Sequence, residues 1–197
     1  MKKLVMFALM AVFLVALPVS SLAKLKAPDV LDKEKIKTDE SLSRYESVGV
    51  KISSSEDIEY ENVDDDEKSK MKGFLKDCKK KMARAIVRNL DEDGVKAFVI
   101  GGDDEEGSGK ADMVIEVSIT KVNMGSAVGR AFWGWGAGQA GLSVKGKLVD
   151  VKSGDSLAEF EHENTSGLGD GYKWDLVMRE AEDVGDKIAE FVHKLRR

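Results

Sequence analysis

The sequence has one cysteine and two histidines in 197 residues, and both scarcities limit its chemistry. With Cys78 alone, no disulfide can form within the chain, and a tetrahedral zinc site built from cysteines is excluded. His162 and His193 fall in segments with strand and helix patterns, and no nucleophile motif surrounds either. We therefore expect a non-enzymatic protein without a metal ion or cofactor. A hydrolase, the least favoured alternative, would need His162 and a carboxylate to converge in a pocket.

An excess of basic residues is also absent. The chain has 31 lysines and arginines against 36 aspartates and glutamates, a formal net charge of −5. An acidic balance of this kind favours solubility and disfavours nucleic acid as a partner.

The one long apolar run stands at the N-terminus. Lys2 and Lys3 precede the uncharged residues 4–17, and Ser21-Leu22-Ala23 supplies the small residues that a signal peptidase accepts. The run is shorter than the roughly 20 residues that cross a bilayer, and no cysteine near the expected cleavage site could carry a lipid. The sequence predicts a cleavable signal peptide over residues 1–23 and a mature chain free in the periplasm or outside the cell. An uncleaved anchor is the alternative.

The remaining chain has the patterns of one α/β domain. Residues 24–43 are charged and lack periodicity, which predicts a flexible leader before a single domain over 44–197. Apolar residues at three- and four-residue spacing predict helices over 66–90 and 173–195. Alternating runs predict strands in the order β-α-β-β-β-β-α. We expect an α+β fold in which one mixed or mostly antiparallel sheet of about five strands carries both amphipathic helices on one face. The buried face of the first helix is predicted to consist of Met71, Phe74, Leu75, Cys78, Met82, Ala85, Ile86 and Leu90.

A glycine-rich stretch over residues 125–141 separates two of the expected strands and contains two of the three tryptophans. Its Gly136-x-Gly138-x-x-Gly141 spacing matches the dinucleotide fingerprint, but a strand follows where that motif requires a helix, so nucleotide binding is rejected. Two interpretations stay open. The glycines could let a loop cross close to the sheet with its aromatic rings inside, or the rings could form an exposed contact surface. The contact residues on the second interpretation are Arg130, Phe132, Trp133 and Trp135.

The first expected helix carries basic residues at every fourth position on the side opposite its apolar face. This surface could contact anionic lipid headgroups or an acidic partner, and a solvated helix face is the alternative. Its central members are Lys72, Lys76, Lys80 and Arg84.

A family resemblance rests on the segment from Val122 to Phe160. It contains Gly129-Arg130, then Gly134-x-Gly136-Ala137-Gly138, and then residues 148–160 (LVDVKSGDSLAEF) with their V-D-x-x-S-G turn. This resembles the exported bacterial domain-of-unknown-function family 4410, and the resemblance covers most of residues 44–195. It implies an exported or surface-tethered α/β domain with no established activity. Many members look like lipoproteins, whereas this chain lacks the lipidated cysteine, and no catalytic residues carry over.

These observations favour an exported binding or adaptor module of the bacterial cell envelope. Its expected partners are a protein or another envelope component, with peripheral contact to an anionic membrane surface. A self-associating structural subunit is the alternative, in which the Gly/Trp-rich segment would be buried between the protomers of a homo-oligomer.

Overall fold

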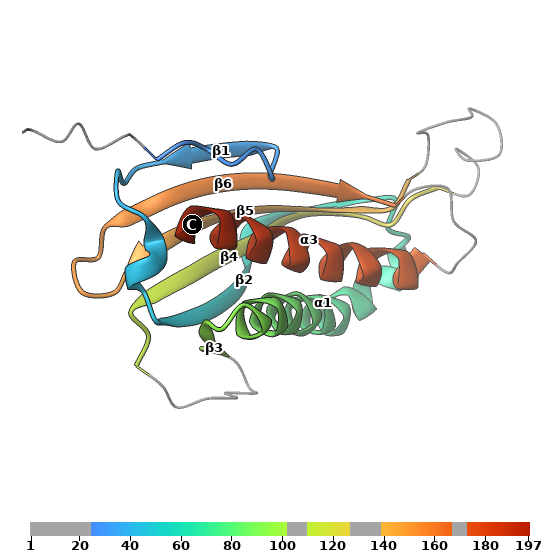
Figure 1. Ribbon diagram of the computed structural model, residues 1–197. Helices are drawn as coiled ribbons and strands as arrows, with labels where there is room; N and C mark the ends of the chain where they lie inside the picture. Colours follow the sequence, from blue (N-terminus) through green and yellow to red (C-terminus); the bar gives the residue numbers. More distant parts are fainter. Residues whose placement is uncertain (1–24, 102–109, 127–138, 167–172) are drawn as a thin grey trace, which may run out of the picture.

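A computed structural model describes residues 25–101, 110–126, 139–166 and 173–197, and these form one mixed six-stranded sheet with two long helices on one face (Figure 1). The strand order is β1-β6-β5-β4-β2-β3. β2 is parallel to both β3 and β4, and the other neighbours are antiparallel. In chain order the elements are β1 (Lys33–Ile36), η1 (Leu42–Arg44), β2 (Ser47–Glu61), α1 (Asp65–Glu92), β3 (Lys96–Val99), β4 (Met113–Asn123), β5 (Gly141–Asp150), β6 (Ser156–Thr165) and α3 (Lys173–Arg196). The expected α+β class is confirmed, with one strand more than the sequence indicated.

The two helices share one face of the sheet because each presents an apolar stripe. α1 packs on β2 and β3, α3 packs on β5 and β6, and the helices also contact each other (Figure 1). They approach closely at Gly185, where a Cβ atom would lie 2.7 Å from both the Ala85 Cβ and the Met82 carbonyl oxygen. Every residue predicted for the buried face of α1 is buried, namely Met71, Phe74, Leu75, Cys78, Met82, Ala85, Ile86 and Leu90.

The segment expected to be a flexible leader, residues 24–43, contributes to the fold. Lys33–Ile36 pair with β6 as an edge strand, and Leu31 and Leu42 are only 5% and 1% exposed. The Glu34 carboxylate accepts hydrogen bonds from three successive backbone N–H groups, those of Asp29, Val30 and Leu31, at 2.7–3.0 Å. The prediction of a flexible leader was wrong for this segment. Its strand β1 is held by pairing with β6, which is distant in the sequence. A strand of four residues is too short to show an alternating pattern that the sequence alone would reveal.

The other face of the sheet is not covered by any element among the described residues. At its centre lies Gly146, opposite Phe160 on β6. The Phe160 ring occupies the space where a Gly146 side chain would stand, on the side of the helices, and it packs edge-on against Phe191 of α3 with ring centroids 5.5 Å apart. Gly146 thus makes room for the Phe160 ring on the helix side, and at this position the open face is formed by the backbone of β5.

Candidate functional site

The open face of the sheet carries charged and polar side chains in rows that cross the strands. The rows arise because alternate residues of a strand share a face and directly paired residues lie side by side. The first row is Lys51, Glu116, Lys147, Glu159 and Lys35, and the second is Ser53, Ser118, Lys145, Glu161 and Lys33. Each row takes one residue from each of β2, β4, β5, β6 and β1.

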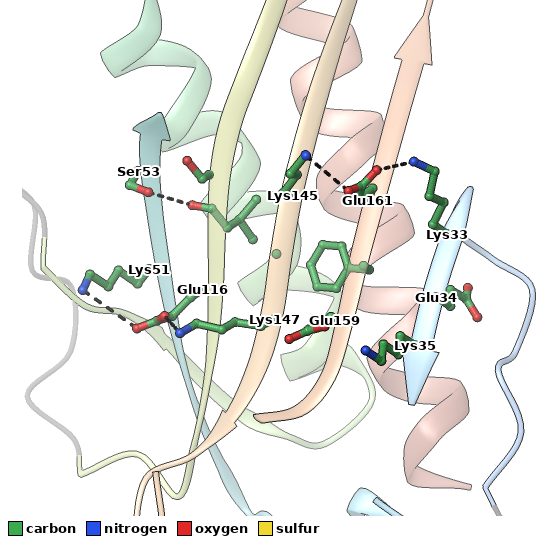
Figure 2. Close-up of a pocket in the computed structure, with 14 residues that line it drawn as sticks. Lys33, Glu34, Lys35, Lys51, Ser53, Glu116, Lys145, Lys147, Glu159 and Glu161 are labelled. Atoms are coloured by element: carbon green, nitrogen blue, oxygen red, sulfur yellow. Dashed lines mark hydrogen bonds and ion pairs between the residues drawn. The ribbon is translucent and has the colours of Figure 1, made fainter. Parts of the chain in front are cut away.

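Glutamates in these rows bridge lysines on both sides (Figure 2). Glu116 lies 3.0 Å from the Lys147 ammonium and 4.0 Å from that of Lys51. Glu161 lies 2.6 Å from Lys33 and 3.3 Å from Lys145. Hydrogen bonds from Lys33 and then Lys145 lower the pKa of Glu161 below its usual value. The Glu161 carboxylate is therefore held charged at neutral pH. The rows as a whole donate and accept hydrogen bonds alternately.

Between the two rows the surface is hollowed, with a volume of about 570 Å³. In Figure 2 the labelled side chains Lys51, Glu116, Lys145 and Lys147 lie in front of the strands, with the helices behind the sheet. The floor includes Gly146 and the hydroxyls of Ser53 and Ser118, and the Ser53 hydroxyl donates to the Val117 carbonyl oxygen at 3.2 Å. The flanks are formed by Lys33, Glu34, Lys35, Lys51, Glu116, Lys145, Lys147, Glu159 and Glu161. The size is that of an ordinary ligand pocket, although the site is an open groove.

This groove was not predicted from the sequence. The signal for it is the repetition of like charges two residues apart, Lys145 with Lys147 and Glu159 with Glu161, which places each pair on one face of a strand. Recognising that the pairs adjoin requires the β5–β6 register, and the lysines of β1 lie in a segment that had no strand pattern.

The predicted Gly/Trp contact residues, Arg130, Phe132, Trp133 and Trp135, lie outside the described residues. The strands on either side of them are described. β4 and β5 are antiparallel neighbours, and Asn123 pairs with Gly141, so the connection leaves and re-enters the sheet at adjacent positions. The starts of α1 and α3 and the end of β6 lie at the same end of the molecule (Figure 1). We name it the loop end.

Buried contacts fix the two sides of this connection. Met124 and Ala140 are fully buried. The Ser166 hydroxyl, itself buried, donates to the Ala140 carbonyl oxygen at 3.1 Å and accepts from the Ala140 N–H at 3.2 Å. A third link joins the Asn62 side-chain amide to the Asn123 side-chain oxygen at 2.8 Å. The described ends of the connection are thus held by the core and by the neighbouring strands.

The four basic residues predicted to form a contact surface lie on α1. Lys72, Lys76 and Arg84 are exposed on α1 and Lys80 is half-buried, all on the side away from the sheet. This surface and the groove lie on opposite sides of the molecule, so the structure does not combine them. Two other bases of α1 pair with acids of α3: Lys81 with Glu182 at 3.0 Å, and Arg88 with Glu182 and Asp186 at 3.2 and 2.9 Å.

His162, the residue on which a hydrolase would depend, does face a carboxylate. Its Nδ1 lies 3.1 Å from Oδ2 of Asp32, which also accepts the Glu163 N–H at 2.7 Å. The Nε2 atom is buried and contacts no hydrogen-bonding group in the part of the chain that the structure describes. His162 does not line the groove. Within the same residues, no group of three or more histidine, cysteine, aspartate or glutamate side chains could hold a metal ion.

The chain matches one family model and is distantly similar to several solved structures. The family model described as "Domain of unknown function (DUF4410)" matches residues 30–169, which confirms the resemblance found in the sequence. No curated protein matches the chain. Among the described residues, no helix has the length and apolar character to cross a membrane.

Several solved structures are similar to this chain at low sequence identity. A PelC dodecamer from Paraburkholderia phytofirmans is 13% identical, with a TM-score of 0.44 over 79% of this chain and 97% of that one. A DUF330 protein from Xanthomonas campestris is 11% identical, with a TM-score of 0.43 over 75% and 81%. A lipoprotein from Neisseria meningitidis is 15% identical, with a TM-score of 0.38 over 64% and 84%.

Proposed function

The chain belongs to the DUF4410 family, and on that premise we propose that it is an exported, non-enzymatic binding or adaptor module of the bacterial cell envelope. The predicted signal peptide over residues 1–23 supports export. The chemistry of the described surfaces supports binding, because they offer rows of charges along an open groove. We propose the Gly/Trp-rich segment as the principal contact surface, with Arg130, Phe132, Trp133 and Trp135 as its contact residues.

The observation that carries this proposal is the anchoring of the loop end. Contact residues bind best when their supports are already ordered, because ordering them on binding costs free energy. Here Met124 and Ala140 are buried on the two sides of the segment, and Ser166 bonds both backbone groups of Ala140. Tryptophan and arginine are the residue types that most often dominate binding energy. A rigid base with such residues between its ends suits a partner site.

The basic surface of α1 supports a second, weaker contact of the same module. Exposed ammonium and guanidinium groups on Lys72 and Arg84 would attract an anionic membrane surface while the loop end holds its partner. This contact would be lost at high salt, because exposed charges are screened within about 8 Å at physiological ionic strength.

The proposal is tested by chemical crosslinking in intact cells, followed by identification of captured envelope components. The double variant Trp133→Ala with Trp135→Ala is expected to lose capture and to keep the circular dichroism of the wild type. Tyr60→Ala provides the matched control, since Tyr60 is an aromatic residue of β2 that is 39% exposed. Undiminished capture by the tryptophan variant would exclude the segment as the contact surface. A collapse of the fold in that variant would show that the rings belong to the core.

One observation supports the self-association alternative. β3 pairs only with Ser47–Val50, so the rest of β2 as far as Glu61 is an edge of the sheet among the described residues. Unpaired strand edges can pair with another chain. Light scattering across a range of protein concentrations tests this alternative: a mass above that of the monomer supports it, and a constant monomeric mass excludes it.

A further inference from the structure

The groove on the open face has more ammonium groups than available carboxylates. Among the described residues, five lysines and four glutamates line it. The Glu34 carboxylate is occupied by three backbone N–H groups, and Glu159 forms an ion pair with Lys37, which does not line the groove. Glu116 and Glu161 are the carboxylates that pair with the groove lysines. The chain as a whole has a net charge of −5, so the groove reverses the sign of the protein. A surface of this kind attracts an anionic ligand.

The spacing of the lysines limits which anionic ligands fit the groove. In the first row Lys51, Lys147 and Lys35 stand on alternate strands, with Glu116 and Glu159 between them. Neighbouring strands are about 4.8 Å apart, so the lysines repeat about every 10 Å across the sheet. A polyproline II helix has three residues per turn and rises about 3.1 Å per residue, so every third side chain returns to the same side after about 9 Å. The two repeats are nearly equal.

The groups between the lysines fit the backbone of such a peptide. A polyproline II segment has no internal hydrogen bonds, so its N–H and C=O groups are free to pair. Glu116 and Glu159 offer acceptors, and the lysines and Ser118 offer donors. The one aromatic ring among the lining residues, Phe160, packs toward Phe191 in the core. The described groove therefore has no stacking platform for a sugar ring.

We infer that the groove binds an extended acidic segment of a protein partner, which lies across the strands with a carboxylate at every third residue. The carboxylates face Lys51, Lys147 and Lys35, and the second row flanks the peptide through Lys145 and Lys33. This inference rests on the proposed binding function and assigns that function a second surface and a partner chemistry.

The test is a fluorescence anisotropy titration of the exported protein with a labelled peptide of four Glu-Ala-Pro repeats at low salt. We expect saturable binding that salt weakens. The double variant Lys51→Gln with Lys147→Gln is expected to weaken binding about tenfold or more, since it removes two central charges. Lys96→Gln with Lys152→Gln is the matched control, because both lysines are exposed outside the groove and the net charge changes equally, so binding should be unchanged. Equal weakening by both double variants would overturn the inference in favour of unspecific attraction.

Two further experiments test whether binding needs the shape of the groove and whether the ligand is an acidic peptide. Ser118→Trp places a large side chain on the floor of the groove without changing its charge, and it is expected to abolish binding while the circular dichroism stays unchanged. A Gln-Ala-Pro peptide should not bind. Binding of that neutral peptide as tight as that of the acidic one, or tighter binding of an acidic uronate oligosaccharide, would contradict the proposed ligand.

The peptide titration tests the groove inference, and the envelope capture tests the proposed function, so a negative result in one does not decide the other. The tryptophan variant should bind the acidic peptide like the wild type, because the inference assigns peptide binding to the charged residues of the two rows. Loss of capture with intact peptide binding would support both surfaces. Intact capture with no peptide binding in the wild-type protein would overturn the groove inference and leave the proposed function standing.

Discussion

The Tyr45 hydroxyl donates a 2.7 Å hydrogen bond to Oδ2 of Asp150, 105 residues away in the chain. The other oxygen of Asp150 accepts the N–H groups of Lys152 and Ser153 at 2.8 and 2.9 Å. One carboxylate thus closes the turn between β5 and β6 and ties it to the chain just before β2. Asp150 is the aspartate of the V-D-x-x-S-G turn, on which the family resemblance partly depends. Its contacts give a physical reason for an aspartate at this position.

Tyr45→Phe is expected to lower the free energy of unfolding by about 1–2 kcal/mol. The substitution removes the donor and leaves the ring, which is 4% exposed, in place. Chemical denaturation with an unchanged dependence on denaturant concentration measures the effect. Ser55→Ala, in the irregular part of β2, is a hydroxyl deletion that should change stability little. A Tyr45→Phe variant as stable as the wild type would show that the Asp150 contact is not stabilising.

The Tyr45–Asp150 contact also predicts a pH dependence. Hydrogen bonds from Tyr45 and then from the Ser153 backbone lower the pKa of Asp150 below its ordinary value. A carboxyl group whose pKa is lowered on folding stabilises the fold above its unfolded pKa of about 4, and this stabilisation is lost as the pH falls through the folded pKa. The stability difference between wild type and Asp150→Asn should therefore be constant from neutral pH to about pH 5 and shrink below about pH 4. A difference that grows on acidification would contradict this assignment.

The helices were predictable because their signal is local. The apolar spacing of α1 marked its buried face from Met71 to Leu90, and its start at Asp65 is fixed by Glu67, whose carboxylate accepts the Asp64 N–H at 3.0 Å. Such patterns lie within one turn or a few, so a sequence shows them directly. The strand β1 and the groove were not predictable in this way. Both depend on the register of β6, which brings Lys33 beside Glu161 across 128 positions of sequence.

Two glycines on the long helices are expected to respond to alanine in opposite directions. At Gly185 a Cβ would collide with Ala85 and the Met82 carbonyl oxygen, so Gly185→Ala should destabilise the protein by about 1–3 kcal/mol. At Gly73 on the exposed side of α1 nothing lies within 4 Å, so Gly73→Ala should stabilise it by about 0.5–1 kcal/mol through helix propensity. Thermal unfolding of both variants measures the two changes in stability. Destabilisation by Gly73→Ala would mean that its exposed surface contacts another part of the assembly.

Cys78 is expected to be unreactive in the folded protein. Its side chain is fully buried beside the Met178 sulfur at 3.5 Å, and burial raises the thiol pKa to about 12. The thiolate, which is the reactive form, is then scarce at neutral pH. Labelling with a thiol reagent should be slow in buffer and fast in denaturant. Rapid labelling of the native protein, or a disulfide-linked dimer without reductant, would place this helix face at the surface.

The packing of residues 25–43 gives the most direct test of where the folded domain begins. Leu31 is 5% exposed and belongs to the core, and its backbone is held by the Glu34 carboxylate. Truncating a buried leucine removes apolar contacts and leaves a cavity, which costs about 2–5 kcal/mol. Because Leu31 lies near the edge of the core, where neighbours can relax, Leu31→Ala should cost about 2 kcal/mol. Lys35→Ala, on the exposed side of β1, should change stability by less than about 0.5 kcal/mol. If both variants unfolded at the wild-type denaturant concentration, this segment would be a leader outside the domain, and the pairing of β1 with β6 would contribute nothing to its stability.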